Sequence, residues 1–321
     1  MHLARGFPSA ILARDVIGAQ CTPCFTVQFA MGRAKTCRSY PLRFTSLRKS
    51  TSGRLEPMKH VILTGATRGI GFGLAQSFLE RGCAVAISGR DPASVGEALR
   101  RLKAQFPEAQ VLGQACDVRQ VGQIQALWDA AMQAWGTIDL WVNNAGISGA
   151  DAMIWDLPLG AADDIIDTNL LGTIAACQIA VKGLLAQGHG AIYNMQGMGS
   201  DGRMHNGLAL YGTSKYAISY FTRALAKELK DQPILIGSLQ PGMVITDLLT
   251  EPYRDRPEEF ERVKRIFNII GERVETVTPW LAERMLANTR SGVAISFSSR
   301  WKLMWRFMTA PFVKRELFED N

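Results

Sequence analysis

From Lys59 to about residue 240, short apolar runs alternate with longer amphipathic stretches, and this alternation constrains the fold more than any other feature. The apolar runs are continuous, as expected for strands that are covered on both faces. Strands that alternate with helices form a parallel sheet with helices on both sides. The predicted strands are residues 60–64, 84–88, 109–114, 138–142, 191–195 and 234–239.

This order of elements predicts an α/β fold: a doubly wound parallel sheet of the Rossmann type with helices on both faces, built as a single domain over residues 58–299. Neither an internal repeat nor a linker divides that range. The most apolar stretch, residues 169–185, is interrupted by Gln178 and Lys182, which favours a core helix over a membrane span. The predicted helices are residues 70–81, 92–104, 121–135, 162–186 and 210–230.

Residues 1–57 differ in composition from the rest of the chain. They contain nine Lys and Arg residues and two acidic ones, so they account for the whole net charge of +7. The basic charge is therefore no argument for nucleic-acid binding by the folded part. A tract rich in Ser, Thr and Arg resembles an organelle transit peptide; alternatively, Met58 is the true start and the tract is spurious translation. Under both interpretations we expect this tail to be disordered.

The six cysteines fall into two groups. Cys21 and Cys24 form a C-x-x-C within the N-terminal tail, without a second pair, and the sequence predicts no metal site. Cys83, Cys116 and Cys177 stand in apolar surroundings, which is typical of buried, reduced thiols in an intracellular protein.

A glycine-rich loop, T-G-A-T-R-G-I-G at residues 64–71, follows the first predicted strand and opens the first predicted helix. Glycines let the backbone turn sharply and approach a pyrophosphate, and the helix N-terminus offers free N–H groups to the phosphate charge. A plain tight turn is the alternative, but the strand–loop–helix context favours a dinucleotide site. The candidate cofactor residues here are Gly65, Thr67, Arg68, Gly69, Ile70 and Gly71.

The residues after the second strand discriminate between NAD and NADP. A carboxylate there suits the ribose 2′-OH of NAD, and a cation suits the 2′-phosphate of NADP. Arg90 stands where the cation is needed, and Arg68 can join it. Asp91 could instead bind the ribose, but it precedes Pro92, which favours an N-cap role for Asp91. The sequence therefore predicts NADPH as the cofactor.

Two further loops follow the third and fourth strands. Asp117 and Val118 come where the adenine would lie, and N-N-A-G at residues 143–146 contains small residues that let the cofactor pass over the sheet edge. Each loop is a weak signal alone, since Asn-Ala-Gly is also an ordinary turn. Their order after successive strands makes Asn144, Ala145 and Gly146 candidate cofactor contacts.

Tyr211 and Lys215 lie four residues apart near the start of a predicted helix and so share one face. Reduction of a carbonyl needs a hydride on carbon and a proton on oxygen. A tyrosine can donate that proton, and a nearby ammonium lowers its pKa from about 10 by stabilising the phenolate. Such pairs also occur by chance, but this one follows a complete nucleotide-binding pattern, which favours a catalytic role and cofactor contact for both residues.

Together these motifs resemble the short-chain dehydrogenase/reductase family over about residues 59–250, with Y-G-T-S-K at 211–215 and P-G-M-V-I-T at 241–246 as the most specific segments. The resemblance implies Tyr211 as catalytic acid/base, Lys215 as its electrostatic partner and a ribose ligand, and Asn169 as holder of a proton-relay water. It also implies cofactor contacts for Pro241, Gly242, Val244 and Thr246, the last at the nicotinamide carboxamide. A helix-buried Asn169 and an N-cap role for Thr246 are the alternatives.

One motif departs from the family pattern. A serine is expected about thirteen residues before the tyrosine, where this chain has Gly197 or Met198. Ser200 is the nearest hydroxyl and our candidate catalytic serine, Gln196 could also donate, and Ser200 as a plain loop residue is the alternative. The loop N-M-Q-G-M-G-S-D-G resembles that of the chlorophyll(ide) b reductases. This resemblance implies NADPH-dependent reduction of a 7-formyl group to hydroxymethyl, with glycines opening space for a flat macrocycle.

Two alternatives stay open: a general carbonyl or 3-oxoacyl reductase, and an NADPH-binding regulatory protein without turnover. The expected partners are a small carbonyl substrate, chlorophyll(ide) b among the candidates, and further copies of the chain in a homo-oligomer; no nucleic acid is expected. The protein would be intracellular and soluble, in a plastid if residues 1–57 are a transit peptide and otherwise in the cytoplasm of a photosynthetic bacterium.

The C-terminal segment, residues 300–321, interleaves aromatic, Met and basic residues. One interpretation is a helix packed on the core or on a partner subunit. The other is a weak peripheral membrane contact, because Trp suits the headgroup region and Lys and Arg attract anionic lipid. In that second interpretation Lys302, Arg306, Lys314 and Arg315 provide a salt-sensitive attachment.

Overall fold

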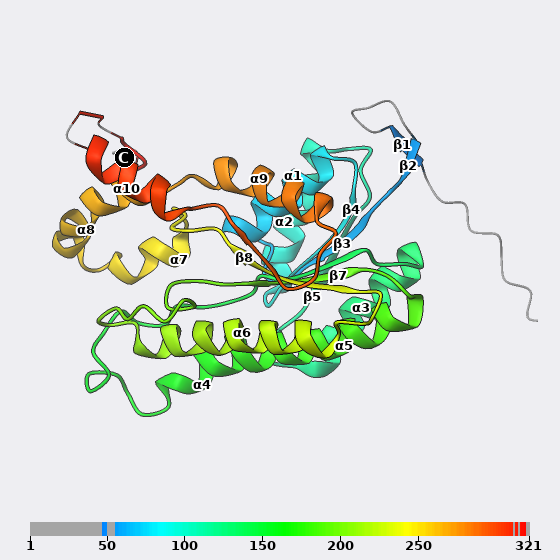
Figure 1. Cartoon of the computed structure of the whole chain (residues 1–321), viewed down its shortest axis with the longest axis horizontal. Helices are drawn as coiled ribbons and strands as arrows, with labels where there is room; N and C mark the ends of the chain where they lie inside the picture. Colours follow the sequence, from blue (N-terminus) through cyan, green and yellow to red (C-terminus); the bar gives the residue numbers. More distant parts are fainter. Residues whose placement is uncertain (1–46, 50–54, 311, 314, 319–321) are drawn as a thin grey trace, which may run out of the picture. The chain divides into compact units, whose positions relative to one another are not determined.

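The computed structural model describes residues 47–49, 55–310, 312–313 and 315–318 (Figure 1). Within the N-terminal tail, two short strands, β1 (Leu47–Lys49) and β2 (Leu55–Pro57), pair antiparallel with each other and belong to a separate two-stranded sheet. Cys21, Cys24 and the predictions made for residues 1–46 lie outside the described residues, as does Lys314.

The main sheet has seven parallel strands in the order β5-β4-β3-β6-β7-β8-β9, which confirms the predicted doubly wound Rossmann-type fold. The order reverses direction at β3, so the loops after β3 and β6 flank a crevice at the carboxyl edge, where such folds bind ligands. The strands are β3 (His60–Leu63), β4 (Ala84–Gly89), β5 (Val111–Ala115), β6 (Leu140–Asn143), β7 (Ala191–Met195), β8 (Leu235–Gln240) and β9 (Val293–Ser296).

Helices cover both faces of this sheet (Figure 1). On one face, α1 (Gly69–Glu80) and α9 (Val274–Ala287) pack side by side, with α2 (Pro92–Gln105) beside them, over a core that includes Leu74, Phe78 and Leu281. On the other face lie α3 (Val121–Trp135), α5 (Gly172–Gln187) and α6 (Ala209–Glu228), over a second core around Leu127 and Trp141. The sheet is thus held between two packed layers.

The predicted long helix over residues 162–186 consists of three joined parts: α4 (Ala161–Ile165), a π-helical segment (Ile166–Leu171) and α5. By length and composition Ala161–Gln187 is the one helix among the described residues that could span a membrane. Here it is a core helix, because Ala176, Ala180 and Leu184 are almost completely buried against the sheet. This agrees with the prediction from Gln178 and Lys182.

The chain after β8 contains elements that the sequence pattern did not predict. They are α7 (Asp247–Thr250), a 3₁₀ turn (Glu251–Tyr253), α8 (Pro257–Ile270), α9 and β9. The C-terminal segment, for which a packed helix was one interpretation, contains the helix α10 (Arg300–Thr309). α8 packs through an aromatic cluster of Tyr253, Phe260, Phe267 and Phe318, whose rings lie 5.1–6.3 Å apart between centroids. The last helix and the segment after it therefore fold back onto α8.

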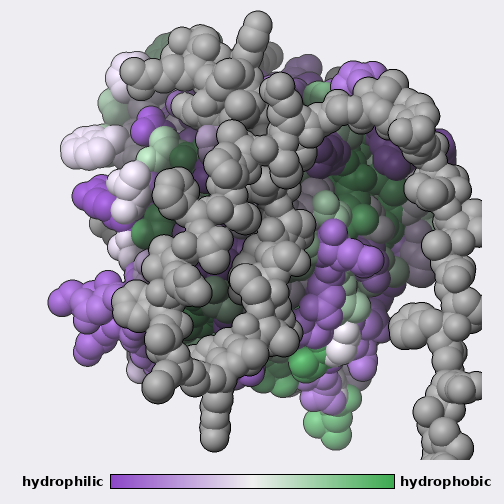
Figure 2. Space-filling model, turned by 90° about the vertical axis from the view of Figure 1, so that its right-hand side faces the viewer, coloured by the Kyte–Doolittle hydropathy of each residue, from purple (hydrophilic) through white to green (hydrophobic). Residues whose placement is uncertain are grey.

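The amino edge of the sheet, seen in Figure 2, mixes hydrophilic and hydrophobic residues where described residues are visible. At this edge Asp139 accepts hydrogen bonds from the Lys59 ammonium (2.8 Å) and the His60 backbone (2.9 Å), which ties β3 to the segment before β6. Cys83, Cys116 and Cys177 are buried, as predicted.

Candidate active site

The glycine-rich loop after β3 is held by direct backbone packing against the loop after β6. The Thr64 hydroxyl accepts hydrogen bonds from the N–H groups of Asn144 (3.0 Å) and Ala145 (3.1 Å), and the Asn144 amide donates back to the carbonyls of Thr64 and Gly65. A Cβ on Gly65 would lie 2.6 Å from Cα of Ala145. A side chain at Gly65 would therefore push the two loops apart.

The start of α1 suits a phosphate. Gly65 and Gly69 have φ values of +60° and +56°, a left-handed conformation that glycine adopts without strain. Among the described residues no side chain caps the α1 N-terminus, and its first turn, which contains Ile70 and Gly71, holds no acidic residue. The first N–H groups of a helix have no partner within the helix and attract anions. The loop is therefore a cradle that fits the pyrophosphate of a dinucleotide.

The end of β4 carries the two residues that decide between cofactors. Asp91 caps α2, because its carboxylate accepts from the N–H groups of Ala93 (3.3 Å) and Ser94 (2.8 Å), and this confirms the N-cap interpretation. These hydrogen bonds, with one from the Ser94 hydroxyl as the largest cause, lower the pKa of Asp91. The exposed Arg90 follows Gly89, against which Thr67 of the glycine loop packs.

Arg68 has other partners. Its guanidinium pairs with Asp247 at 3.1 Å and Glu251 at 3.6 Å, at the start of α7 and the 3₁₀ turn, and its side chain remains 64% exposed. Such exposed ion pairs contribute little free energy, so they do not fix Arg68 in place. In the structure Arg90 is thus the cation beside β4, and Arg68 spans the glycine loop and the segment after β8.

The loop after β5 is ordered by an ion pair that the sequence pattern did not include. The Asp117 carboxylate accepts from the Arg119 guanidinium at 2.7 Å, and Arg119 also reaches Asp164 at 2.7 Å. The hydrogen bond from Arg119 is the main cause of a lowered pKa at Asp117. Val118 is buried against Gly172 at the start of α5. Val118 therefore lines the predicted cofactor site on the side where the adenine would lie.

Tyr211 and Lys215 share the inner face of α6, beside the end of β7. The Lys215 Nζ lies 5.6 Å from the centroid of the Tyr211 ring and donates to the Met195 carbonyl at 3.4 Å. Burial raises the pKa of Tyr211 to about 12 and lowers that of Lys215 to about 8. At neutral pH the tyrosine is therefore protonated, which is the state that an acid catalyst needs, and the lysine still carries its charge.

Asn169 lies in the π-helical segment and is completely buried. Its side-chain amide donates to the Ile147 carbonyl and accepts from the Ile147 N–H, both at 2.9 Å, and it also donates to the Ser214 hydroxyl at 3.0 Å. A Cβ on Gly146 would lie 3.1 Å from Asn169 Oδ1 and 3.4 Å from Lys215 Nζ. Asn169 thus clamps the loop after β6 next to the lysine.

The glycine-rich loop after β7 replaces the expected serine with backbone. A Cβ on Gly197 would overlap the Tyr211 hydroxyl, so only glycine lets that hydroxyl lie against the loop. Ser200, our candidate serine, lines a different cavity of about 300 Å³, which Tyr216, Ser219 and Ser238 also line. Gln196 is occupied as well, since its Oε1 accepts from the Gln240 amide at 2.6 Å. The residue in contact with the Tyr211 hydroxyl is therefore Gly197 rather than Ser200.

The loop after β8, which begins at Pro241, approaches the glycine loop from the other side. A Cβ on Gly69 would lie 3.4 Å from the Thr246 methyl group, and the side chain of the N-cap residue Thr246 makes no capping bond to the described part of α7. Gly242 has a φ of +79° and packs against Ser298. Val244 is buried and forms an isolated parallel bridge with Glu272.

The model of the family described as short chain dehydrogenase matches residues 59–257. The chain belongs to this family. It is 34% identical over 253 residues to the chloroplastic chlorophyll(ide) b reductase NOL of Arabidopsis thaliana, covering 75% of this chain and 70% of that protein. Such identity identifies an oxidoreductase of this family and leaves its substrate undecided.

Two solved structures have the same fold as this short-chain dehydrogenase. The actinorhodin polyketide ketoreductase with NADPH superposes with a TM-score of 0.67 at 28% identity, covering 75% of this chain and 95% of that one. The 3-ketoacyl-(acyl-carrier-protein) reductase from Brucella melitensis complexed with NADH gives 0.66 at 25% identity, covering 74% and 96%. A nicotinamide cofactor is typical of the family, and these relatives hold both of its forms.

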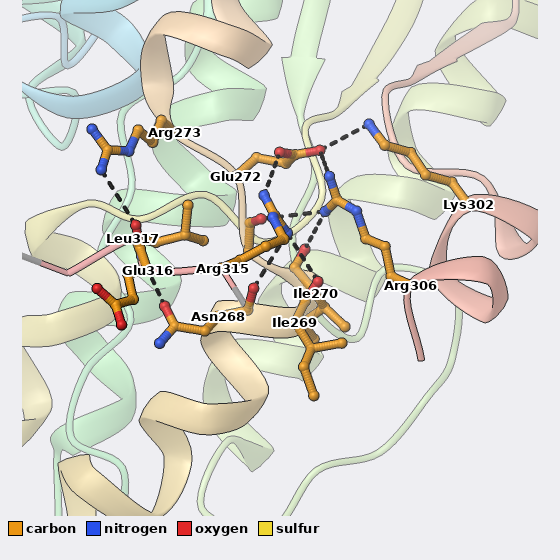
Figure 3. A network of polar contacts seen from close by, with 11 residues as sticks. Asn268, Ile269, Ile270, Glu272, Arg273, Lys302, Arg306, Arg315, Glu316 and Leu317 are labelled. Atoms are coloured by element: carbon orange, nitrogen blue, oxygen red, sulfur yellow. Dashed lines mark hydrogen bonds and ion pairs between the residues drawn. The ribbon is translucent and has the colours of Figure 1, made fainter. Parts of the chain in front are cut away.

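A buried carboxylate, Glu272, organises the C-terminal part of this short-chain dehydrogenase (Figure 3). Its side chain is 5% exposed and pairs with Lys302 at 2.8 Å, Arg306 at 2.5 Å and Arg315 at 3.2 Å. The two arginines also donate to four carbonyls at the end of α8, those of residues 268–271. In the lipid-contact interpretation four cations face the membrane. Three of them, Lys302, Arg306 and Arg315, instead pair with Glu272, and the fourth, Lys314, lies outside the described residues.

Sequence reasoning did not identify Glu272 or the role of Gly197. The backbone of Glu272 pairs with the loop after β8, since its N–H donates to Met243 and its carbonyl accepts from Ile245, both at 2.9 Å. Its side-chain partners lie 30 to 43 residues further along the chain, so no local pattern marks it. For Gly197 a signal did exist, because it stands at the position where the family serine is missing.

Proposed function

We propose that this protein is an NADPH-dependent reductase of chlorophyll(ide) b, converting the 7-formyl group to hydroxymethyl. The observation that carries the proposal is the contact between the Gly197 backbone and the Tyr211 hydroxyl. Without a serine side chain, the Tyr211 hydroxyl lies directly against glycine backbone, an arrangement that a side chain at position 197 would exclude, and the loop N-M-Q-G-M-G-S-D-G resembles that of the chlorophyll(ide) b reductases. The 34% identity to a chlorophyll(ide) b reductase supports the same substrate.

The cofactor would be held by the cradle at Gly65, Gly69 and the α1 N-terminus, with Arg90 paired to the 2′-phosphate and Asn144 to Gly146 beneath the nicotinamide half. Thr246 and Lys215 would hold the carboxamide and the ribose. When bound, NADPH supplies the hydride that adds to the formyl carbon. Asp91 is committed to capping α2 and cannot easily take a ribose hydroxyl, which supports NADPH over NADH.

Tyr211 donates its proton to the formyl oxygen as the hydride reaches the carbon, so the aldehyde becomes a primary alcohol and a phenolate remains. The charge that develops on Tyr211 is stabilised by the ammonium of Lys215, which lies beside its ring. Asn169 holds the loop after β6 at a fixed distance from this pair. A proton that enters from water, for which Asn169 is the proposed holder, would restore the phenol.

Exposed apolar side chains follow the strands near the site: Ile154, Trp155 and Leu159 after β6, and Met204 after β7. They support a large apolar substrate at the carboxyl edge. The exposed rings of Tyr216 and Tyr220 on α6 support self-association. The composition of residues 1–57, with a chloroplastic relative, supports a plastid as the compartment.

A second candidate is reduction of a 3-oxoacyl thioester, favoured by the structural match to a 3-ketoacyl reductase. The test is NADPH oxidation by the purified protein with chlorophyllide b, a 3-oxoacyl thioester and simple ketones, with the pigment product separated and identified. We expect kcat/KM for chlorophyllide b to exceed the others roughly tenfold or more, a difference of about 1.4 kcal/mol in transition-state binding. A preference for the thioester would overturn the pigment substrate, and NADPH binding without any turnover would favour a regulatory role.

A further inference from the structure

The C-terminal helix α10 presents its apolar residues to solvent and its cations to the protein. Trp301, Met304, Trp305 and Met308 recur at intervals of three and four residues, so they form one line along the helix, here called the Trp301 stripe. Trp301 is 77% exposed, Trp305 66% and Met308 64%, and Phe312 beyond the helix is 87% exposed. A helix on the surface of a soluble protein normally has the opposite orientation.

This orientation is fixed by specific contacts. Lys302 and Arg306 lie on the opposite side of α10, where both pair with the buried Glu272 (Figure 3). Lys302 also lies 3.9 Å from the centroid of the Phe297 ring. Rolling the helix to bury the Trp301 stripe would take Lys302 and Arg306 away from the buried Glu272 and leave it with Arg315, and the loss of partners for a buried charge is costly. The apolar stripe is therefore a built feature of the surface.

The size and chemistry of the stripe decide what covers it. A stable interface between two proteins uses about 20–30 residues on each side. That is far more than the four residues of the stripe together with their exposed apolar neighbours Phe307, Phe312 and Val313. A short apolar line containing two Trp residues matches a helix that lies in the headgroup region of one lipid leaflet, where Trp is enriched. If a second copy of the chain covered the stripe, the contact would be far smaller than a stable interface needs.

We propose that α10 docks this protein on a lipid bilayer by inserting the Trp301 stripe into the boundary between headgroups and acyl chains. Because Lys302, Arg306 and Arg315 are directed toward Glu272 while the Trp301 stripe is exposed, apolar burial provides the main part of the attachment, which therefore persists on neutral lipid and at high salt. This differs from the charge-driven contact that the sequence suggested. The proposal stands whether or not chlorophyllide is the substrate.

Docking through α10 also places the catalytic edge near the lipid. The helix follows the carboxyl end of β9, and all carboxyl ends of a parallel sheet lie at one edge, where the loops after β6 and β7 carry their own exposed apolar residues (Figure 1). Glu272 connects the two regions, because its side chain holds α10 while its backbone pairs with the loop after β8. A substrate dissolved in the bilayer would thus reach the site from the docked face.

The test is flotation of the full chain with vesicles of neutral phosphatidylcholine at low and high salt. We compare the wild type with a Trp301→Ser/Trp305→Ser variant and with Tyr220→Ser, a matched control that removes a 68% exposed ring from α6. Quenching of Trp fluorescence by lipids brominated along the acyl chain reports insertion in the wild type itself. Thermal unfolding and turnover of a water-soluble carbonyl verify that each variant is folded.

We expect the wild type to float at both salt concentrations and Tyr220→Ser to float like the wild type. The vesicle affinity of the double variant should be lower by roughly tenfold or more. Absence of flotation or of quenching for the wild type overturns the proposal. Flotation only on anionic vesicles at low salt would assign attachment to exposed cations instead. Self-association without lipid that the double variant abolishes would assign the stripe to a second copy of the chain.

Discussion

The amino-terminal half of the sheet, β3 to β6, and the carboxy-terminal half, β7 to β9 with α10, build their parts of the site by different means. In the first half the loops pack backbone against backbone, as at Gly65 and Ala145, and are joined by hydrogen bonds of the uncharged Thr64 and Asn144 side chains. In the second half side chains with charge or acidity carry the arrangement, namely Tyr211 and the buried Lys215 and Glu272. Backbone contacts tolerate almost no added atoms, whereas side-chain contacts depend on the charge and protonation state of a few groups.

The largest effect should come from the proton donor of the second half. Tyr211→Phe removes the hydroxyl and should lower kcat about a thousandfold, because general acid catalysis contributes factors of this order. NADPH binding, measured by fluorescence titration, should change less than about twofold, since the hydroxyl acts in the transition state. Lys215→Met should impair both quantities. A Tyr211→Phe enzyme that keeps most of its activity would remove Tyr211 from the chemistry.

Next in size is the effect of discharging the buried carboxylate. Glu272→Gln should lower the free energy of unfolding by about 3 kcal/mol, the lower end of the cost of breaking a buried ion pair, because Lys302 and Arg315 are part-exposed. Urea denaturation measures this value. A matched control is Glu275→Gln. This change also removes a negative charge, in the first turn of α9, but Glu275 is not part of the ion cluster around Glu272.

The same variant gives a pH test. Burial raises the pKa of Glu272, but the bonds and charges of Lys302 and Arg306 outweigh it, so the net pKa lies below 4.5. A carboxyl with a lowered folded pKa stabilises the protein fully above its unfolded pKa and loses that contribution as pH falls through the folded one. The stability difference between wild type and Glu272→Gln should therefore be full at pH 7 and shrink below about pH 4.5. A difference that does not vary with pH would contradict the ion cluster.

The backbone-built half should respond to a single methyl group. A Cβ on Gly71 would meet the Gly65 carbonyl, the Asn144 amide and Cα of Ala66 at 2.8 Å, so Gly71→Ala should destabilise by about 1–3 kcal/mol and weaken NADPH binding. Gly96→Ala on α2 is the matched control, since no described atom lies within 4 Å of its Cβ. That variant should gain about 0.5–1 kcal/mol. Equal effects of the two changes would mean that the glycine loop is not close-packed.

The smallest effect concerns an exposed side chain in the first half. Arg90→Ala should lower kcat/KM for NADPH roughly tenfold and leave that for NADH unchanged, because one charge-assisted contact to the 2′-phosphate is lost. Arg68→Ala should have less effect, since the Arg68 guanidinium lies at Asp247 and Glu251 on the segment after β8, whereas Arg90 directly follows β4. Parallel titrations with both cofactors measure this. If NADH is preferred by the wild type, Asp91 would have to leave its cap to bind the ribose.

The sequence predicted the first half well and the second half only in part, for a physical reason. Strand and helix patterns are local, and the glycine loop is a contiguous motif, so residues 59–146 could be read directly. Glu272 acquires its role from three cations that are distant in the chain. For residues 300–321 a packed helix was one interpretation, and α10 is a helix. The other interpretation directed Lys302 and Arg306 toward lipid, because isolated cations are expensive to bury and the sequence did not reveal the carboxylate of Glu272 that pairs with them.

Gly197 is a second case in which the local sequence did not reveal a contact that the tertiary fold creates. The missing serine was visible in the motif, and Ser200 was the nearest hydroxyl in the chain. Proximity in sequence did not predict proximity in space, since the turn after Gly197 directs Ser200 to another cavity. The π-helical segment at Asn169 was likewise unpredicted, because its residues are ordinary helix formers and only the tertiary contact with Ile147 reveals the altered winding.

That π-helical segment has an evolutionary consequence. Its wider winding places one residue more in the turn than an α-helix would, and this brings Asn169 to Ile147 while Ala176, Ala180 and Leu184 of α5 keep facing the sheet. Deleting any single residue between 166 and 171 would rotate one of these two sets by about 100° relative to the other. Selection should therefore tolerate substitutions at Leu170 or Leu171 far better than the deletion of one residue there. Among related proteins, the length of this segment should vary less than its amino-acid sequence.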